Sequence, residues 1–304
     1  MRHGAPVCIR VRTGFTLSEL VVAMTVAGVM LAIVTGIAVK QQRVLADLAD
    51  DAALGAQLQD ARAIVPAELR AIATAAGDVR DARDTAVEFR SVIANAVVCD
   101  TTASSLVLAP VATTVTTLAS IAQPIEANDT AWVLSLDDSG PTWMPARVTG
   151  VGTAAPGACP SPAPALDATQ RSLARVSLTL STRPSSPLGM PVRVTRPVRY
   201  SLYKASDNDW YVGQRDWNNS SLRLNTIQPV AGPFLSAAQS GLRFTYLDTT
   251  GTVLSTPVAD SRAIALIRVD VRGETQHVHR ALGAAGVAAR ARDSATAFVF
   301  MRNR

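Results

Sequence analysis

The sequence contains little cysteine, little charge and few aromatic residues. Of its 304 residues only three are cysteine, 17% are charged and 5% are aromatic, whereas 48% are hydrophobic. Three cysteines are too few for a small domain built on disulfides, and the apolar, weakly charged composition excludes a disordered chain. The length permits one large domain or two modest ones with a sizeable core. The net charge of +5 would favour nucleic acid or an anionic membrane as a partner if it were evenly spread.

The hydrophobic residues are concentrated near the amino terminus. Residues 15–39 contain a single charge, Glu19. As a helix, these 25 residues would be about 37 Å long, which is enough to cross a hydrocarbon core of about 30 Å. We therefore predict a transmembrane helix over residues 15–39.

The charges on either side of this run favour a cytoplasmic amino terminus. Three arginines precede it, and Lys40 and Arg43 follow it. A secretory signal peptide also begins with basic residues, but its apolar core has 7 to 15 residues and its cleavage site follows that core. Here the apolar run is longer, and only a weak small-residue site lies downstream, at residues 36–38. An uncleaved signal anchor remains the alternative.

The junction between the basic flank and the apolar run reads Gly-Phe-Thr-Leu-Ser-Glu, from Gly14 to Glu19. It resembles the class III signal of type IV prepilins and pseudopilins. The resemblance implies that a membrane-embedded prepilin peptidase cuts between Gly14 and Phe15 and methylates the new amino terminus at Phe15. Residues 1–14 would then be a basic leader that is removed.

Glu19 needs a partner because a lone carboxylate in a membrane helix costs about 2.5 to 3.5 kcal/mol even on insertion scales. After cleavage, the free amine of Phe15 would lie one turn from Glu19, at the positive end of the helix dipole. The resemblance implies that Glu19 attracts the Phe15 amine of a neighbouring subunit during assembly. The alternative is that Glu19 only caps the helix.

The helical pattern continues beyond the membrane run, with apolar residues at steps of three and four. We predict one helix from Phe15 to about Ala75, with residues 40–75 outside the membrane and a late bend or interruption at Pro66. Gly36 stands where major pilins often carry proline, which favours a minor subunit.

Residues 76–304 have a different character, with short alternating runs separated by turn residues. Residues 175–181 and 192–202 alternate as half-buried strands do, and Pro197 predicts an edge strand or a bulge for the second run. Three later runs predict an antiparallel meander, at 242–246, 267–271 and 296–301, with a turn at 248–251 after the first. The predicted fold class is α+β, a long amino-terminal helix packed on an antiparallel β-sheet head.

The order of motifs in the head resembles that of W-type minor pilins and J-type minor pseudopilins. The motifs that carry this resemblance are 200–203, 210–212, 241–248, 265–271 and 300–303. It implies a protein that initiates or tips a filament.

The cysteines divide between the leader and the head. Cys8 would leave with the leader, whereas Cys99 and Cys159 would share an oxidising compartment and form one disulfide. The bond would close a loop of about 60 residues, worth about 4 kcal/mol in the chain-entropy model.

No enzymatic site can be assembled, so we expect a non-enzymatic protein without a cofactor or metal. Gly150–Ala155 spells a dinucleotide loop, but Pro156 and Gly157 follow where a helix must begin. His277 and His279 lack further ligands at suitable spacing, and no GxSxG motif occurs. The acidic segments 137–140 and 207–209 predict turns rather than calcium sites.

Nucleic acid is an unlikely partner once the leader is removed. The candidate contacts are Arg193, Arg196, Arg199, Arg268, Arg272, Trp210 and Trp217. Loss of Arg2, Arg10 and Arg12 leaves 290 residues with a net charge of +2. Strand arginines more often form a solvated face.

These observations predict a single-pass protein of the bacterial inner membrane with a periplasmic head, which later enters a pilus or pseudopilus. The expected partners are other pilins or pseudopilins, the prepilin peptidase, the inner-membrane assembly platform and membrane lipid. The alternatives are a J-type minor pseudopilin of a type II secretion system, and a membrane-anchored exported binding domain that never polymerises.

Overall fold

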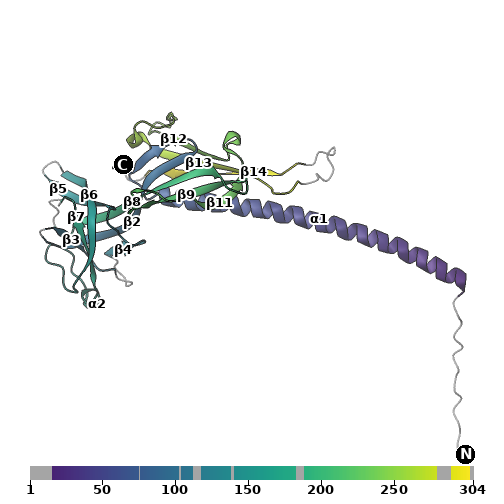
Figure 1. Cartoon of the computed structure of the whole chain (residues 1–304), viewed down its shortest axis with the longest axis horizontal. Helices are drawn as coiled ribbons and strands as arrows, with labels where there is room; N and C mark the ends of the chain where they lie inside the picture. The colour runs from purple at the N-terminus through teal and green to yellow at the C-terminus, as the bar shows by residue number, and fades with distance from the viewer. Residues whose placement is uncertain are drawn as a thin grey trace, which may run out of the picture.

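The computed structural model shows a long helix that carries a β-rich head (Figure 1). The described residues are 16–74, 76–102, 104–111, 118–137, 140–182, 188–278 and 289–301. The leader, residues 1–14, therefore lies outside them. The predicted α+β class is confirmed: a long amino-terminal helix is followed by antiparallel sheets.

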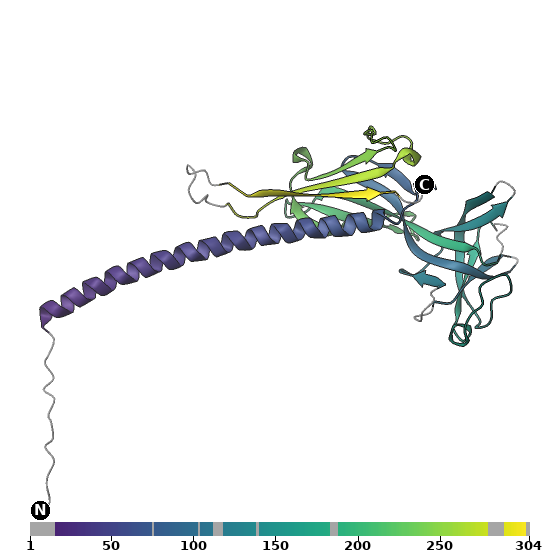
Figure 2. The ribbon, with the colours of Figure 1, turned by 180° about the vertical axis from the view of Figure 1, so that it is seen from behind.

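Helix α1 runs from Leu17 to Leu69, over 53 residues. It curves gently along its length (Figures 1 and 2). It ends three residues after Pro66, earlier than the expected end near Ala75, a residue outside the described part of the chain. The carboxylate of Asp78 accepts the N–H of Ala73 at 2.7 Å and so stabilises a tight turn in place of a further helical turn.

The head contains two antiparallel sheets. The larger sheet has eleven strands, with order β1-β2-β3-β7-β6-β5-β8-β9-β10, while β4 pairs with β2, β11 pairs with β9, and β2 also pairs with β8. Its strands are β1 (Val79–Ala82), β2 (Ala86–Thr101), β3 (Ser105–Leu108), β4 (Ala119–Ile121), β5 (Thr130–Asp137), β6 (Gly140–Ala154), β7 (Arg175–Leu180), β8 (Pro191–Lys204), β9 (Trp210–Asn218), β10 (Arg223–Leu224) and β11 (Gln228–Phe234). A short helix, α2 (Ala168–Arg171), precedes β7.

The smaller sheet is the predicted meander. It consists of β12 (Leu242–Leu247), β13 (Leu266–Glu274) and β14 (Arg292–Phe300), paired antiparallel in that order. Short 3₁₀ turns lie at Ala237–Gln239 and Ser261–Ala263. Along β12 and β13 buried and more exposed residues alternate, which is the period-two pattern of a sheet with one face in the core.

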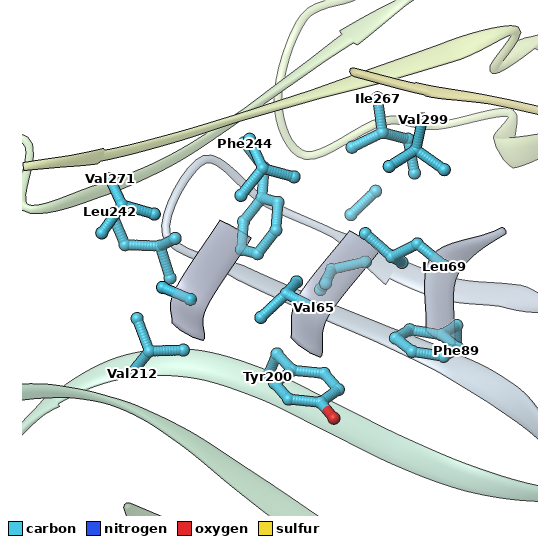
Figure 3. Close-up of a cluster of buried hydrophobic side chains, with 14 of the residues drawn as sticks. Val65, Leu69, Phe89, Tyr200, Val212, Leu242, Phe244, Ile267, Val271 and Val299 are labelled. Carbon is cyan, nitrogen blue, oxygen red and sulfur yellow. The ribbon is translucent and has the colours of Figure 1, made fainter. Parts of the chain in front are cut away.

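The last third of α1 lies between the two sheets. Its buried apolar residues recur at steps of three and four: Leu54, Leu58, Ala61, Val65 and Leu69. Figure 3 shows Val65 and Leu69 with Phe244, Ile267 and Val299 on one side and Phe89 and Tyr200 on the other. The helix is therefore an integral part of this core, which we call the proximal core.

A second lobe lies beyond the carboxyl end of α1 (Figures 1 and 2). We call it the distal lobe; its separate core is centred on Ile93, Val133 and Leu178. Strands β2 and β8 run through both lobes and pair continuously, with one register shift between Val92 and Ala94.

The edge position predicted for residues 192–202 is wrong. Strand β8 is interior, with β2 on one side and, on the other, first β5 and then β9. Pairing with β5 ends at Thr195 and pairing with β9 begins at Val198, so Pro197 occupies the gap between these two partners. A proline tolerates this position because it lacks the N–H that a third strand would use.

A buried ion pair connects the end of the helix to the distal lobe. Arg193 on β8 donates to Asp78 at 2.8 Å, and the Asp78 side chain is fully buried. The Arg193 guanidinium also lies 5.1 Å from the ring centroid of Trp132 and 5.4 Å from that of Trp143. These contacts set the position of the distal lobe relative to α1.

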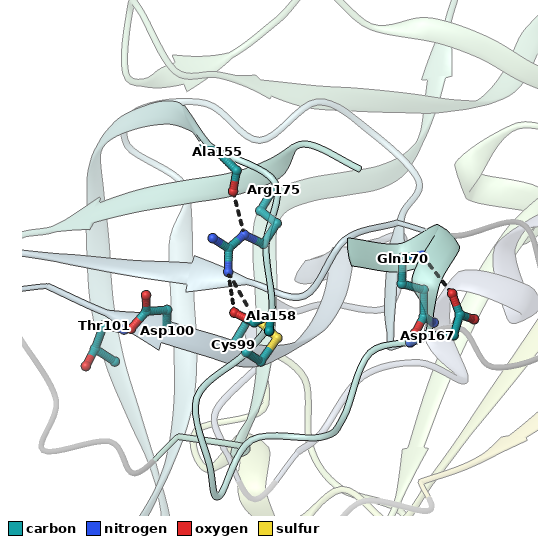
Figure 4. Close-up of a disulfide and its surroundings, with 9 residues drawn as sticks. Cys99, Asp100, Thr101, Ala155, Ala158, Asp167, Gln170 and Arg175 are labelled. Carbon is teal, nitrogen blue, oxygen red and sulfur yellow. Dashed lines mark hydrogen bonds between the residues drawn. A yellow bond between two sulfur atoms is a disulfide. The ribbon is translucent and has the colours of Figure 1, made fainter. Parts of the chain in front are cut away.

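The structure joins Cys99 and Cys159 in a disulfide, with Cα atoms 4.8 Å apart (Figure 4). Cys99 lies near the end of β2 and is buried, and Cys159 lies in the proline-rich loop after β6. Arg175 holds the same loop by donating from Nε to the carbonyl oxygen of Ala155 at 2.9 Å. The disulfide therefore ties this loop to the end of β2 in the distal lobe.

We expect Leu69→Ala to lower the free energy of unfolding by about 2–5 kcal/mol, because it opens a cavity between the helix and both sheets. The matched control is Ile64→Ala, at a partly exposed position on the same helix, which should change it by less than about 1 kcal/mol. Urea unfolding of the full chain in detergent would measure both. Equal effects would contradict the placement of Leu69 in the core.

Removal of the disulfide by Cys159→Ser should cost about 2–5 kcal/mol of stability. Alkylation of the unfolded, unreduced protein should label neither Cys99 nor Cys159. Labelling of both residues in protein taken from the membrane fraction would contradict the bond.

Candidate assembly surface

The first part of α1 is an apolar surface that no described residue covers. From Leu17 to Leu48 its large apolar side chains are exposed, and Leu17 itself is 82% exposed. An 18-residue window of this helix has a mean hydropathy of 2.5 and none of it is buried. By length and composition the helix can cross a membrane. Water alone is an unfavourable environment for such a surface, so lipid or other helices must cover it.

The helix is longer than a membrane is thick. From Leu17 to Leu54, the first buried position, it extends about 55 Å, whereas a hydrocarbon core needs about 30 Å. If residues 15–39 lie in the membrane, residues 40–53 place about 20 Å of helix between the membrane and the head. This exposed segment carries the first charges after Glu19, beginning with Lys40 and Arg43.

Glu19 closes a capping box at the start of α1. Its Oε2 atom accepts the backbone N–H of Thr16 at 3.0 Å and the Thr16 hydroxyl at 3.0 Å. In return the Thr16 hydroxyl oxygen accepts the N–H of Glu19 at 3.4 Å. Both bonds to the carboxylate use Oε2, and Oε1 has no hydrogen-bond partner among the described residues. The structure thus shows Glu19 as part of the helix cap, and its role in assembly stays a prediction.

The predicted cleavage residues, Gly14 and Phe15, lie outside the described residues. The structure therefore gives no distance between the Glu19 carboxylate and the Phe15 amine. The first described residue after the expected cut is Thr16, which is the N-cap residue of α1.

One contact beside the exposed helix was not signalled by the sequence. His277, which follows β13, has its Nδ1 atom 2.7 Å from Oδ2 of Asp50 on α1. It therefore pairs with an aspartate of the helix, while His279 lies outside the described residues. Within the described ranges, no three His, Cys, Asp or Glu side chains are grouped as metal ligands would be.

Four of the five arginines considered for nucleic acid, all except Arg272, lie beside carboxylates. Arg196 donates to Asp129 at 2.8 Å, and this hydrogen bond raises the pKa of Arg196. Arg199 lies 3.2 Å from Asp81, and Arg193 forms an ion pair with Asp78. These side chains stabilise the head and do not form an unpaired basic groove.

The other candidate motifs have structural roles. Gly150–Ala154 lies inside β6, paired with β7, and no helix begins directly after it as a dinucleotide site requires. Asp207 accepts the N–H of Asp209 at 2.9 Å and the hydroxyl of Tyr211 at 2.8 Å, as expected of a turn. These bonds lower the pKa of Asp207 and raise the pKa of Tyr211 to about 12. In the 137–140 turn, residues 138 and 139 lie outside the described part.

The last turn of the helix carries a half-buried carboxyl. The hydroxyl of Tyr200 lies 2.9 Å from Oε1 of Glu68 and 3.0 Å from Oε1 of Gln214. Burial raises the pKa of Glu68 more than the Tyr200 hydrogen bond lowers it. Folding therefore shifts the protonation equilibrium of Glu68 toward the neutral form, compared with the unfolded chain.

The amino-terminal segment matches the family model of the prokaryotic N-terminal methylation motif over residues 9–35. This match includes Gly14, Phe15 and Glu19 and supports a type IV pilin-like protein. No curated protein and no solved structure matches the chain. The head therefore has to be interpreted from its own geometry.

We expect Glu68→Gln to change how stability depends on pH. Because the folded state raises the pKa of Glu68, its favourable contribution is fully present below the unfolded pKa and is lost as the pH rises through the folded value. The glutamine variant should therefore gain stability relative to the parent as the pH rises above about 4, near the ordinary pKa of glutamate. Urea unfolding at several pH values would measure the difference. A difference that is constant with pH would contradict the raised pKa.

Proposed function

We propose that this chain is a minor subunit of a type IV pilin-like filament, processed between Gly14 and Phe15 and acting in the initiation or at the tip of the filament. One observation carries the proposal. The methylation motif over residues 9–35 leads into a helix whose apolar first part is uncovered, while its last third is built into the head. In this proposal the chain is a structural protein and not an enzyme.

The exposed part of α1 is suited both to a membrane and to a filament. In the membrane, all of its backbone hydrogen bonds are made within the helix and its apolar side chains face lipid. Transfer into a filament would replace lipid by neighbouring helices of similar polarity, so the exchange needs little hydrophobic driving force and depends on packing and polar contacts. Glu19 is the only charged residue in this span and thus the natural polar contact.

The shape of the head favours a tip or initiating position over the shaft. The distal lobe extends beyond the carboxyl end of α1 (Figure 2). In a shaft, the subunit above would place its own head and helix near that space. A tip subunit has no neighbour there, and this agrees with the resemblance to W-type minor pilins.

Two other functions share some of these features. A J-type minor pseudopilin of a type II secretion system would have the same helix and processing and differ in its neighbours. A membrane-anchored exported binding domain would keep residues 1–14 and would not assemble. The distal lobe is large and has its own core, and this feature favours the membrane-anchored binding domain.

Processing separates the filament subunit from the anchored domain. Intact mass and terminal sequencing of the protein from the membrane fraction should show a methylated Phe15 at the start. A chain that begins at Met1 or after Ala38 would exclude processing of the prepilin type.

The role of Glu19 can be separated from capping. Glutamine at N3 preserves a capping box but carries no charge, so Glu19→Gln should be cleaved normally and yet fail to enter filaments. The matched control is Thr16→Ala, which removes the N-cap hydroxyl and keeps the carboxylate; it should still enter filaments. Immunoblots of sheared filaments and membranes would measure both. Normal incorporation of Glu19→Gln together with loss of Thr16→Ala would assign Glu19 to capping.

A further inference from the structure

The free edge of β14 is an unusual surface for the head. Among the described residues β14 forms strand pairs only with β13, and α1 is its other main neighbour. Residues 295–300 of this strand contain neither charge nor proline, which are the usual protections of an edge strand. Phe298 is 53% exposed and Phe300 is 67% exposed.

The hydrogen-bond register shows which backbone groups point to that edge. Met301 donates to Ala265 at 3.0 Å, and Thr275 donates to Ala291 at 2.9 Å, at the two ends of the β13–β14 ladder. Because hydrogen-bonded and non-hydrogen-bonded pairs alternate along an antiparallel ladder, the odd-numbered residues of β14 face β13.

The even-numbered residues Thr296, Phe298 and Phe300 therefore direct their N–H and C=O groups outward. No hydrogen bond from the described residues reaches these outward backbone groups. The same three positions thus offer unpaired backbone groups and, at two of them, exposed aromatic side chains. An extended segment that added to this edge would use both at once.

The opposite edge of the same sheet is sealed by the chain itself. There Phe244 on β12 donates to the carbonyl oxygen of Asp84 at 2.6 Å, and Leu254 donates to that of Tyr246 at 2.8 Å. Among the described residues, the sheet is therefore paired along its β12 edge and unpaired along its β14 edge. This asymmetry also means that the β12 edge of a second copy is not available to pair with β14.

Membrane orientation excludes another arrangement. Strand β14 runs beside α1 in the same direction (Figure 2). Antiparallel pairing of β14 with β14 of a second copy would turn the two helices in opposite directions, so both could not enter one membrane from the same side. Lipid is not the occupant, since the phenylalanines lie at the end of β14 farthest from the membrane part of α1.

We propose that β14 binds an extended, uncharged strand from the head of a different subunit of the same assembly. The strand would add along the Thr296–Phe300 edge and place apolar side chains beside Phe298 and Phe300. This inference rests on the proposed function, because it requires neighbouring subunits with the same membrane orientation.

The binding can be tested in cells with the full chain. The photoreactive residue p-benzoylphenylalanine in place of Phe298 should cross-link to one other polypeptide that itself has a prepilin-type amino terminus, within an uncharged strand of its head. The matched control places the same residue at Leu222, which is 54% exposed on the β9–β10 connection; no such adduct is expected there. Adducts to lipid, or to β14 of a second copy, would overturn the proposal.

Two variants test the edge separately from folding. Phe298→Lys places a charge on the edge, and Thr296→Pro removes an outward N–H that has no partner within the described residues. Both should lose the partner. Phe298→Lys should keep the unfolding midpoint of the parent, and Thr296→Pro should lower it only by the loss of the hydroxyl bond from Thr296 to Asp270. In contrast, Ala297→Pro removes an inward N–H and should destabilise the head.

Failure of the β14 proposal can be distinguished from failure of the proposed function. Variants that are processed to methylated Phe15 and still bind the partner would refute this inference and leave the proposed function intact. A parent chain that is not processed would refute the proposed function, whatever the state of β14.

Discussion

The structure depends on one helix that has to be stable in two different surroundings. Helix α1 is continuous over 53 residues, yet its first part exposes apolar side chains and its last third is buried between two sheets. Because the backbone hydrogen bonds of a helix are internal, the same secondary structure suits lipid, protein neighbours and a protein core. Only the side chains change along its length, and they change at Leu54, where the contact with the head begins.

The head is organised around the end of this helix. Without α1, the inner faces of the smaller sheet and of strands β2, β8 and β9 would be left without the residues that fill the space between them (Figure 3). The distal lobe has its own core and is joined through two long strands and the Asp78–Arg193 pair. Removing one member of such a buried pair costs more than the pair itself contributes, because it leaves an unpaired charge. The junction is therefore sensitive to sequence change although it lies far from the assembly surface.

Much of this arrangement could be predicted from local sequence, because local patterns have local causes. The apolar period of α1 and the alternation in residues 267–271 led to the helix and the meander. The long-range features could not be derived in this way. Asp78 and Arg193 are 115 residues apart, and Pro197 signals a missing donor without showing that β8 changes partners there. The bare edge of β14 depends on which strands lie beside it, and this is a property of topology. At the amino terminus, the resemblance to the prepilin signal indicated Gly14, Phe15 and Glu19, and the motif match covers them.

The continuous pairing of β2 with β8 has a mechanical consequence. Ladder hydrogen bonds lie perpendicular to their strands, so a pull along the strands loads many of them together. A force that acts on the distal lobe would thus be shared across the pairs from Ala86–Ser201 to Val97–Pro191 before it reaches the proximal core and α1. The disulfide at Cys99 fixes the outer end of the same strand. The two lobes are therefore connected by paired strands, and a force on the distal lobe is carried by the β2–β8 ladder instead of by a flexible linker.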